Sequence, residues 1–359
     1  MKIMKLVRTL SLTLCILSAW ACQTSDHTAT QAPFSFYPTL SQFQFFQGNI
    51  NRLEPVDEVI AYELNSPLFT DYASKARFFR LPPNTKMIYK GSGLAEFPEG
   101  TILIKNFFYQ EGENLTQPNR RLVETRLLVK DQNTWKVGTY IWNDEQTEAY
   151  HEILGGTKKI TWTNPEGETL VINYVIPDNN DCKSCHQNSG KISPIGPKIR
   201  NLNGENVFAG EKANQLVHYA SLGKLEGLPE DFSQIDKLPV WDDDSYSLEE
   251  RARAYLDINC GHCHSANGPA NNTALNLNLE ENDPHKLGFC KGPVSAAQGS
   301  GSLRFDIVPG NARTSILHYR MNSIETGVAM PEIGKTLIHK EGVALIEAWI
   351  NSLDTGGCN

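Results

Sequence analysis

Two five-residue motifs contain the residues of this sequence that are best suited to chemistry. Each has two cysteines separated by two residues and followed directly by a histidine. One helical turn brings such cysteines to one face, where their thiols can add to the two vinyl groups of a haem, and the histidine supplies an axial nitrogen to the iron. The pattern predicts haem c at the second motif and a second haem c at the first. The residues are Cys182, Cys185 and His186 in the first motif and Cys260, Cys263 and His264 in the second.

Cysteine pairs of this spacing also bind structural zinc or act as thiol redox centres. A redox pair belongs at the start of a helix in an α/β unit, and a zinc site would need both motifs to meet and supply four ligands. The histidine directly after each pair favours haem over both. Zinc bound between the two motifs stays open as an alternative.

The second motif has the helical surroundings of a c-type cytochrome. Residues 247–259 have helical periodicity and run directly into it, with Ser247 as the N-cap and Glu250 as its capping-box partner. Residues 313–322 and 340–353 predict two further helices, the last of them amphipathic. A helix before the motif and a closing helix after it are both expected in such a domain.

A methionine between these helices is the expected distal ligand of the second iron. Met330 lies in a loop rich in Gly and Pro, whereas Met321 ends a predicted helix and is expected to pack. His/Met ligation fills both axial positions and suits outer-sphere electron transfer. A proximal histidine usually donates its other ring N–H to a carbonyl, and Pro309 is a candidate acceptor for His264. The alternative is that Pro309 and Gly310 only form the turn before the next helix.

The first motif follows a strand-like segment and has no obvious helical frame. No methionine follows it before Met321. Its distal ligand is open among His151, His218, Met87, a residue of the other domain, or none. If none binds, the iron is five-coordinate.

The N-terminus predicts export. Residues 1–21 contain three basic side chains and then an apolar run ending in Ala-x-Ala, as in a signal peptide, and the run is too short to cross a bilayer. Cys22 follows and is the expected lipidation site, although Ala19 and Trp20 depart from the usual lipobox and leave ordinary cleavage as the alternative. Residues 22–33 form a flexible tether. We expect a periplasmic protein anchored to the outer membrane by a lipid on Cys22.

The rest of the chain divides into a β-rich part and a helical part. Residues 34–204 are rich in β-branched and aromatic residues and predict an all-β, sandwich-like domain that ends in the first motif, with a hairpin over 158–176. Residues 205–246 form a helix and a linker. Residues 247–359 form a small all-α cytochrome c domain. The expected fold class is α+β multidomain.

Four aromatic side chains at alternating strand positions are expected in the core of the β-rich part. The alternative is that they form a binding face for a partner or a polymer. The residues are Trp135, Tyr140, Trp142 and Trp162.

Two further cysteines lie outside both motifs and the N-terminal export segment. Cys290 and Cys358 are an even pair in an oxidising compartment, so we expect a disulfide, with free thiols as the alternative.

The formal net charge of the chain is −8, and removing residues 1–21 takes away three positive charges, which leaves −11. A nucleic-acid partner is therefore not expected.

Seven segments together resemble a family of exported bacterial dihaem c-type cytochromes with an N-terminal β-rich domain and a C-terminal cytochrome c domain. The resemblance covers nearly the whole mature chain. It implies haem on each motif, with Met330 distal at the second. The segments are SPLFTDYASKARFFRLP, FPEGTILIKNFF, LVETRLLV, NDCKSCH, RARAYLDINCGHCH, IVPGNARTSILHYRM and MPEIGKTLIHKEGVALIEAWI.

We therefore expect an electron-transfer protein with a redox protein partner, rather than an enzyme. The alternative is a dihaem peroxidase-like enzyme, in which the iron at His186 has an open position and the haem with Met330 supplies electrons. The sequence places no distal acid or base for that reaction.

Overall fold

The computed structural model describes residues 33–110, 120–164, 167–294, 297–354 and 358. Ser35–Asn359 forms one compact unit. The expected signal peptide, Cys22 and nearly all of the tether lie outside the described residues. Within the part that is described, no helix has the length and apolar character needed to cross a bilayer.

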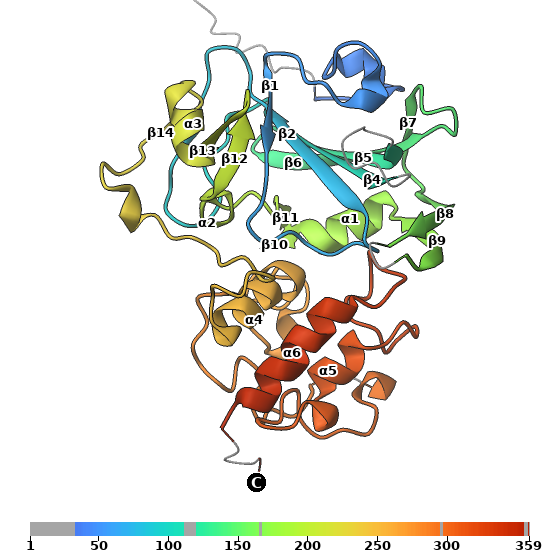
Figure 1. Cartoon of the computed structure of the whole chain (residues 1–359), viewed down its shortest axis with the longest axis vertical. Helices are drawn as coiled ribbons and strands as arrows, with labels where there is room; N and C mark the ends of the chain where they lie inside the picture. The colour runs from blue at the N-terminus through green and yellow to red at the C-terminus, as the bar shows by residue number, and fades with distance from the viewer. Residues whose placement is uncertain (1–32, 111–119, 165–166, 295–296, 355–357, 359) are drawn as a thin grey trace, which may run out of the picture. The chain divides into compact units, whose positions relative to one another are not determined.

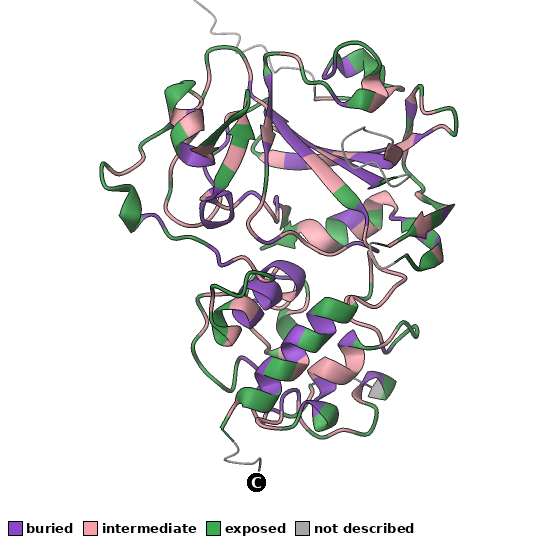
Figure 2. Cartoon of the chain, in the orientation of Figure 1, coloured by how far each residue is buried: buried purple, intermediate pink, exposed green. Residues whose placement is uncertain are grey.

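A six-stranded antiparallel sheet dominates the N-terminal region (Figure 1). Its central strands are buried almost continuously because both faces are covered (Figure 2). In spatial order the strands are β1 (Val59–Tyr62), β2 (Ser74–Arg80), β4 (Ile102–Gln110), β5 (Arg120–Asp131), β6 (Thr134–Trp142) and β7 (Ala149–Glu152).

The turn between β5 and β6 shows how local sequence sets the register of this sheet. Asp131 pairs with Thr134, which leaves Gln132 and Asn133 as a two-residue turn. Both have left-handed φ values, 52° and 59°. Two consecutive positive φ values are the geometry of the hairpin turn that matches the twist of antiparallel strands, and Asn tolerates it well.

Shorter elements complete the β-rich region, whose β-rich character confirms the prediction. Among the described residues the other strands form only two-stranded sheets, so the layers differ from a sandwich of two large sheets. The predicted hairpin is β8 (Gly156–Thr163) with β9 (Thr169–Ile176). The others are β3 (Met87–Ile88) with β14 (Leu225–Glu226), β10 (Gln187–Asn188) with β11 (Lys191–Ile192), and β12 (Glu205–Phe208) with β13 (Glu211–Asn214); the helices are α1 (Asn179–His186), α2 (Ile199–Leu202) and α3 (Gln215–Ser221).

The C-terminal region contains three α-helices joined by long loops. α4 (Leu248–Leu256) begins at Ser247, whose side chain and Glu250 form the predicted capping box, and continues into a π-helix at Asp257–Gly261. α5 (Ile316–Met321) is shorter than predicted, and α6 (Lys340–Ser352) matches its prediction, with an apolar face in the core. Short 3-10 helices elsewhere are Leu40–Phe43, Ile50–Arg52, Phe232–Gln234, Asn271–Thr273, Ala297–Ser300 and Ala312–Thr314.

Three of the four aromatic residues lie in the core, as predicted. Tyr140 and Trp142 are fully buried, and Trp135 is 9% exposed. Trp162 differs, because it is only partly buried and stacks on Tyr72 with ring centroids 5.4 Å apart. The core interpretation is therefore confirmed for the residues of β6.

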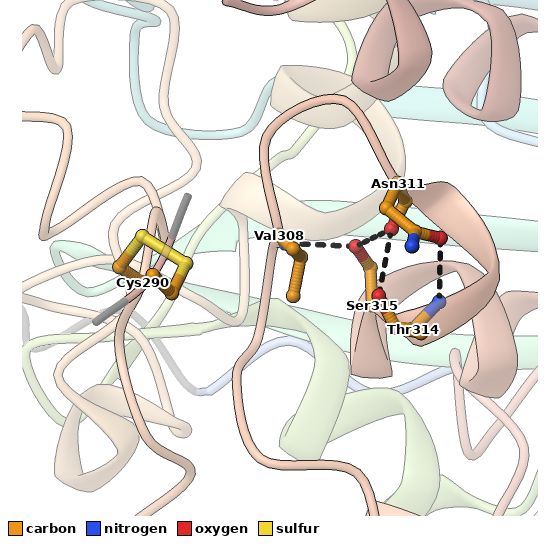
Figure 3. The surroundings of a disulfide bond; sticks show 6 residues. Cys290, Val308, Asn311, Thr314 and Ser315 are labelled. Carbon is orange, nitrogen blue, oxygen red and sulfur yellow. Dashed lines mark hydrogen bonds between the residues drawn. A yellow bond between two sulfur atoms is a disulfide. The ribbon is translucent and has the colours of Figure 1, made fainter. Parts of the chain in front are cut away.

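The expected disulfide joins Cys290 to Cys358, with Cα atoms 5.2 Å apart. It links the loop after the second motif to the end of the chain. Figure 3 shows Cys290 beside a turn in which the Ser315 hydroxyl accepts from the Val308 N–H at 2.8 Å and donates to the Asn311 carbonyl at 2.9 Å. The disulfide and this turn brace the loops that surround α5.

A buried ion-pair group joins the β-rich region to the start of the second motif. Asp257, the first residue of the π-helix, accepts from Arg200 at 2.9 Å and 3.0 Å and pairs with Lys198 at 3.4 Å. The Leu279 N–H also donates to it at 3.1 Å. Burial alone would raise the pKa of Asp257, but Lys198 and Arg200 hold that pKa below its ordinary value. Asp257 is therefore ionised in the folded protein.

Asp257→Asn should lower the free energy of unfolding at pH 7 by about 3 kcal/mol, because Arg200 loses its buried counter-charge and keeps only the exposed carboxylate of Glu280. Since the folded pKa is depressed, this contribution exists above the ordinary pKa of Asp, about 4, and is lost as the pH falls through the folded pKa. Urea unfolding between pH 3 and 7 measures the difference between wild type and variant. Exposed Asp242→Asn is the control, and a difference that persists unchanged at low pH would contradict the assignment.

Candidate functional site

One cavity of about 520 Å³ is lined by both cysteine motifs. All six motif residues reach it, and so does Met330. A haem was predicted separately at each motif, and no pattern in the sequence predicted that the two motifs share a cavity. The structure brings together the predicted cofactor-binding residues Cys182, Cys185, His186, Cys260, Cys263 and His264 with the predicted distal ligand Met330.

The first motif lies on α1, which is longer than the single helical turn that the motif spacing predicts. Asp178 caps this helix by accepting the N–H groups of Asn180 at 2.7 Å and Asp181 at 2.8 Å. The Asp178 N–H donates in turn to the Asp181 carboxylate at 3.3 Å, which completes a capping box. This spacing of two acidic residues was the available signal for the helix.

His186 ends α1 with its ring held in one orientation. Its Nδ1 lies 2.9 Å from the Ser193 carbonyl, and the Ser193 N–H donates to the His186 carbonyl at 2.8 Å. Because a carbonyl only accepts, Nδ1 carries the proton and Nε2 keeps a free lone pair. Burial lowers the pKa of His186 to about 3, so the ring is neutral. A neutral imidazole with a free Nε2 is the form that binds a metal.

His264 is oriented in the same way by a different partner. Its Nδ1 lies 3.1 Å from Thr273 Oγ1, which itself donates to the Ala270 carbonyl at 2.7 Å. The Thr273 hydroxyl therefore accepts from Nδ1, and Nε2 of His264 is free. Burial lowers the pKa of His264 to about 4. The predicted acceptor Pro309 was wrong, because the loop directly after the motif folds back and brings Thr273 closer.

The four motif cysteines are free thiols, of which Cys182 is buried and the other three are partly buried. Burial raises the pKa of Cys260 and of Cys263 to about 12, and it also raises the pKa of Cys182 and of Cys185. A thiol redox centre needs a depressed pKa, so these values disfavour that alternative. Among the described residues, no three His, Cys, Asp or Glu side chains are grouped as ligands of a bare metal ion, and the zinc alternative gains no support.

The two methionines differ as the sequence predicted. Met321 is 5% exposed and belongs to the core around α6, whereas Met330 is only partly buried in its loop. Both side chains reach the cavity. The Met330 N–H donates to the Arg320 carbonyl at 3.0 Å, which ties this loop to α5.

A carboxylate from the β-rich region anchors the same loop. Asp71 accepts the N–H groups of Thr336 at 2.7 Å and Leu337 at 2.8 Å, and the Thr336 hydroxyl donates to its second oxygen at 2.9 Å. Asp71 is 2% exposed, so these bonds are shielded from water. The position of the Met330 loop therefore depends on a residue far away in the sequence.

The other histidines and the remaining methionine considered for the first iron lie elsewhere. His151 stacks on Phe36 with ring centroids 5.2 Å apart, and His218 stacks on Phe208 at 3.7 Å. Met87 is 2% exposed within the core of the β-rich region. None of the three is among the residues that line the cavity.

His262 is a cavity histidine that the sequence analysis did not consider. It belongs to the second motif, yet it acts electrostatically on His186 of the first. Burial lowers the pKa of His262 to about 4, so its ring is neutral. His262 lies between the two cysteines of the second motif, so the sequence associates it with haem attachment there and not with ligation at the first motif.

Asp71→Ala should lower the free energy of unfolding by about 2–4 kcal/mol, because two backbone N–H groups and a hydroxyl lose a charged acceptor. The loop should then open locally, and the Thr336 and Leu337 amides should exchange hydrogen faster than in wild type. Urea unfolding and hydrogen exchange measure both effects, with exposed Asp231→Ala as the control. Full protection of the two amides in the Asp71 variant would show that the loop is held by other contacts.

Comparison of the chain with protein-family models, with curated proteins and with solved structures finds no match. The chemistry of this cavity is therefore inferred from its own residues: two oriented, neutral histidines, four reduced cysteines and a loop methionine.

Proposed function

We propose that this chain is a dihaem c-type cytochrome that transfers electrons. The observation that carries the proposal is that both motifs line one cavity, with both motif histidines held so that Nε2 is free. Haem c would be held by thioethers to the two cysteines of each motif and by His186 or His264. When bound, haem supplies a one-electron redox couple.

The cavity lining suits an amphiphilic, anionic group such as haem. Its volume, about 520 Å³, lies within the usual range for ligand sites. Apolar side chains share the wall with several cations, as an apolar ring with two carboxylates requires. The cations are Arg77, Lys105, Arg126, Lys291, Arg320 and Lys335.

The chain brings the two attachment sites close to each other. Burial raises the pKa of Cys263, and the nearby Cys185 of the other motif raises this pKa further. The loops that follow the two motifs are also hydrogen bonded, from the Ser189 N–H to the Asn267 carbonyl at 2.8 Å. This proximity supports electron exchange within one chain.

The C-terminal region would serve as a cytochrome c domain. α4, the second motif, the Met330 loop and α6 follow one another in the order that such a domain needs. Met330 would be the distal ligand of the second iron and would raise its potential. The buried side chains around it would exclude water from the site.

The sequence supports the cellular setting of this proposal. A signal peptide over residues 1–21 would export the chain to the periplasm, and a lipid on Cys22 would anchor it to the outer membrane. The electron donor or acceptor would be another redox protein.

A dihaem peroxidase-like enzyme is the second candidate. It is favoured by the location of His151, His218 and Met87 outside the cavity, which leaves the first iron without those distal ligands. His262 is the cavity histidine that could instead fill this position.

Haem content tests the proposal directly. The pyridine haemochrome assay should give two haems per chain in the wild type and one in each of two variants, Cys182→Ala/Cys185→Ala and Cys260→Ala/Cys263→Ala. Carbon monoxide added to the reduced protein should leave both spectra unchanged if the chain is an electron carrier. Carbon monoxide binding at one haem would favour the peroxidase-like candidate, and a wild type without covalent haem would refute both.

Met330→Leu should lower the midpoint potential of the second haem and remove its sulfur-to-iron charge-transfer band, because a thioether ligand is lost. Met321→Leu is the matched control and should retain both features. Spectroelectrochemical titration measures the potential and the band together. If the Met321 variant lost the band and the Met330 variant kept it, the two assignments would be exchanged.

A further inference from the structure

Three basic side chains lie side by side across the middle of the large sheet. In the register of β2, β4 and β5, Arg77 pairs with Lys105, and Lys105 pairs with Arg126. Directly opposite residues on neighbouring strands point to the same face, and like charges in that position destabilise a sheet. We call Arg77, Lys105 and Arg126 the basic row.

Only the two ends of the basic row are neutralised. Arg77 pairs with Glu63 at 3.0 Å. Arg126 binds Glu124 through two nitrogens, at 2.8 Å and 2.6 Å. Among the described residues, the ammonium of Lys105 in the middle of the row forms no ion pair. Its Nζ lies over the Phe107 ring, 4.7 Å from the ring centroid.

Lys105 is a partly buried residue whose ammonium has no anionic partner among the described residues. Burial, followed by the charges of Arg77, Lys75 and Arg126, drives its pKa well below the ordinary value, so the charged form is disfavoured until an anion lies beside it. Desolvating a cation without a partner costs free energy, so a lysine is rarely kept in such a place unless something else binds to it. The described residues therefore leave Lys105 without the anion that would stabilise its charge.

The basic row faces the cavity and the first motif. All three of its side chains line the cavity. Burial dominates the pKa of His186, and Lys105 and Arg126 lower it further. The same two cations act on Cys185. The unbalanced charge is therefore within electrostatic reach of the first attachment site.

The neighbouring row of the sheet is apolar. Two residues along each strand, on the same face, Phe79 pairs with Leu103, and Leu103 pairs with Leu128. Leu103 and Leu128 also line the cavity. A ligand on this wall would meet apolar side chains next to a line of cations, which suits a flat apolar molecule with an anionic edge.

We propose that the basic row binds the propionate edge of the haem attached at the first motif, so that a propionate supplies the anion that Lys105 otherwise lacks. This inference rests on the proposed haem at that motif. It gives the β-rich region a function, because the sheet would then orient this haem and set its potential.

The midpoint potential tests the charge. Lys105→Met should lower the potential of the first haem, because an unbalanced propionate favours the ferric state. We expect a tenfold change in the ferric-to-ferrous ratio at a fixed applied potential, which is about 59 mV for one electron. Lys105→Arg should stay near wild type. Exposed Lys159→Met on β8 is the control and should not move the potential.

The redox step of the first haem is identified as the one missing from the Cys182→Ala/Cys185→Ala chain. An unchanged potential in Lys105→Met, with two haems per chain, would overturn the basic-row proposal and leave the proposed function intact. One haem per wild-type chain, carried by the second motif, would instead show that the first haem is absent.

Thermal unfolding tests the same pairing independently of any potential. In the Cys182→Ala/Cys185→Ala chain, Lys105→Met should raise the Tm, because it removes a partly buried amine that has no anionic partner there. In the chain that carries both haems it should not. Equal stabilisation of both chains would overturn the proposal. A second contrary result would be that inorganic phosphate raises the Tm of the wild type but not that of Lys105→Met, because a solute anion would then occupy the basic row.

Discussion

The buried ion pair between Arg200 and Asp257 is the contact on which the shared cavity depends. Arg200 belongs to α2 of the β-rich region, and Asp257 begins the π-helix that leads into the second motif. In a water-poor site, breaking such a pair leaves an uncompensated charge, so the pair fixes one arrangement of the two regions. Asp71 performs a similar role at the other end, where it holds the Met330 loop. Both contacts join segments that are far apart in the sequence.

Charge is distributed unevenly over the sheet that these contacts bring to the cavity. Arg126 is paired with Glu124, whereas the ammonium of Lys105 has no anionic partner among the described residues. A sheet selected only for stability would have an apolar side chain there, because a desolvated ammonium without an anion is costly. Such exceptions concentrate at functional sites, where a missing partner is supplied by a ligand. The proposed electron carrier would use this sheet as one wall of the first haem site.

Several local features could be predicted because they depend on neighbours in the sequence. The capping box at Ser247, the amphipathic α6 and the β8–β9 hairpin follow from side-chain periodicity and turn residues. One helical turn was predicted at the first motif but the full length of α1 was not, although Asp178 and Asp181 marked its start. The Pro309 assignment failed for a different reason. A hydrogen-bond acceptor is chosen by the path of a loop, and Thr273 is closer in space.

By itself the sequence predicted the haem attachment on which the proposed function rests, since two cysteines and a histidine at this spacing lie within about one turn of helix. It also determined the β-rich character of the N-terminal region and the pairing of Cys290 with Cys358. Only the tertiary structure decided that both motifs share one cavity and that Lys105 lines it without an anionic partner among the described residues. Those facts depend on strand register and on contacts between distant segments. Periodicity along the chain reports which face of an element is buried, but not which other element covers it.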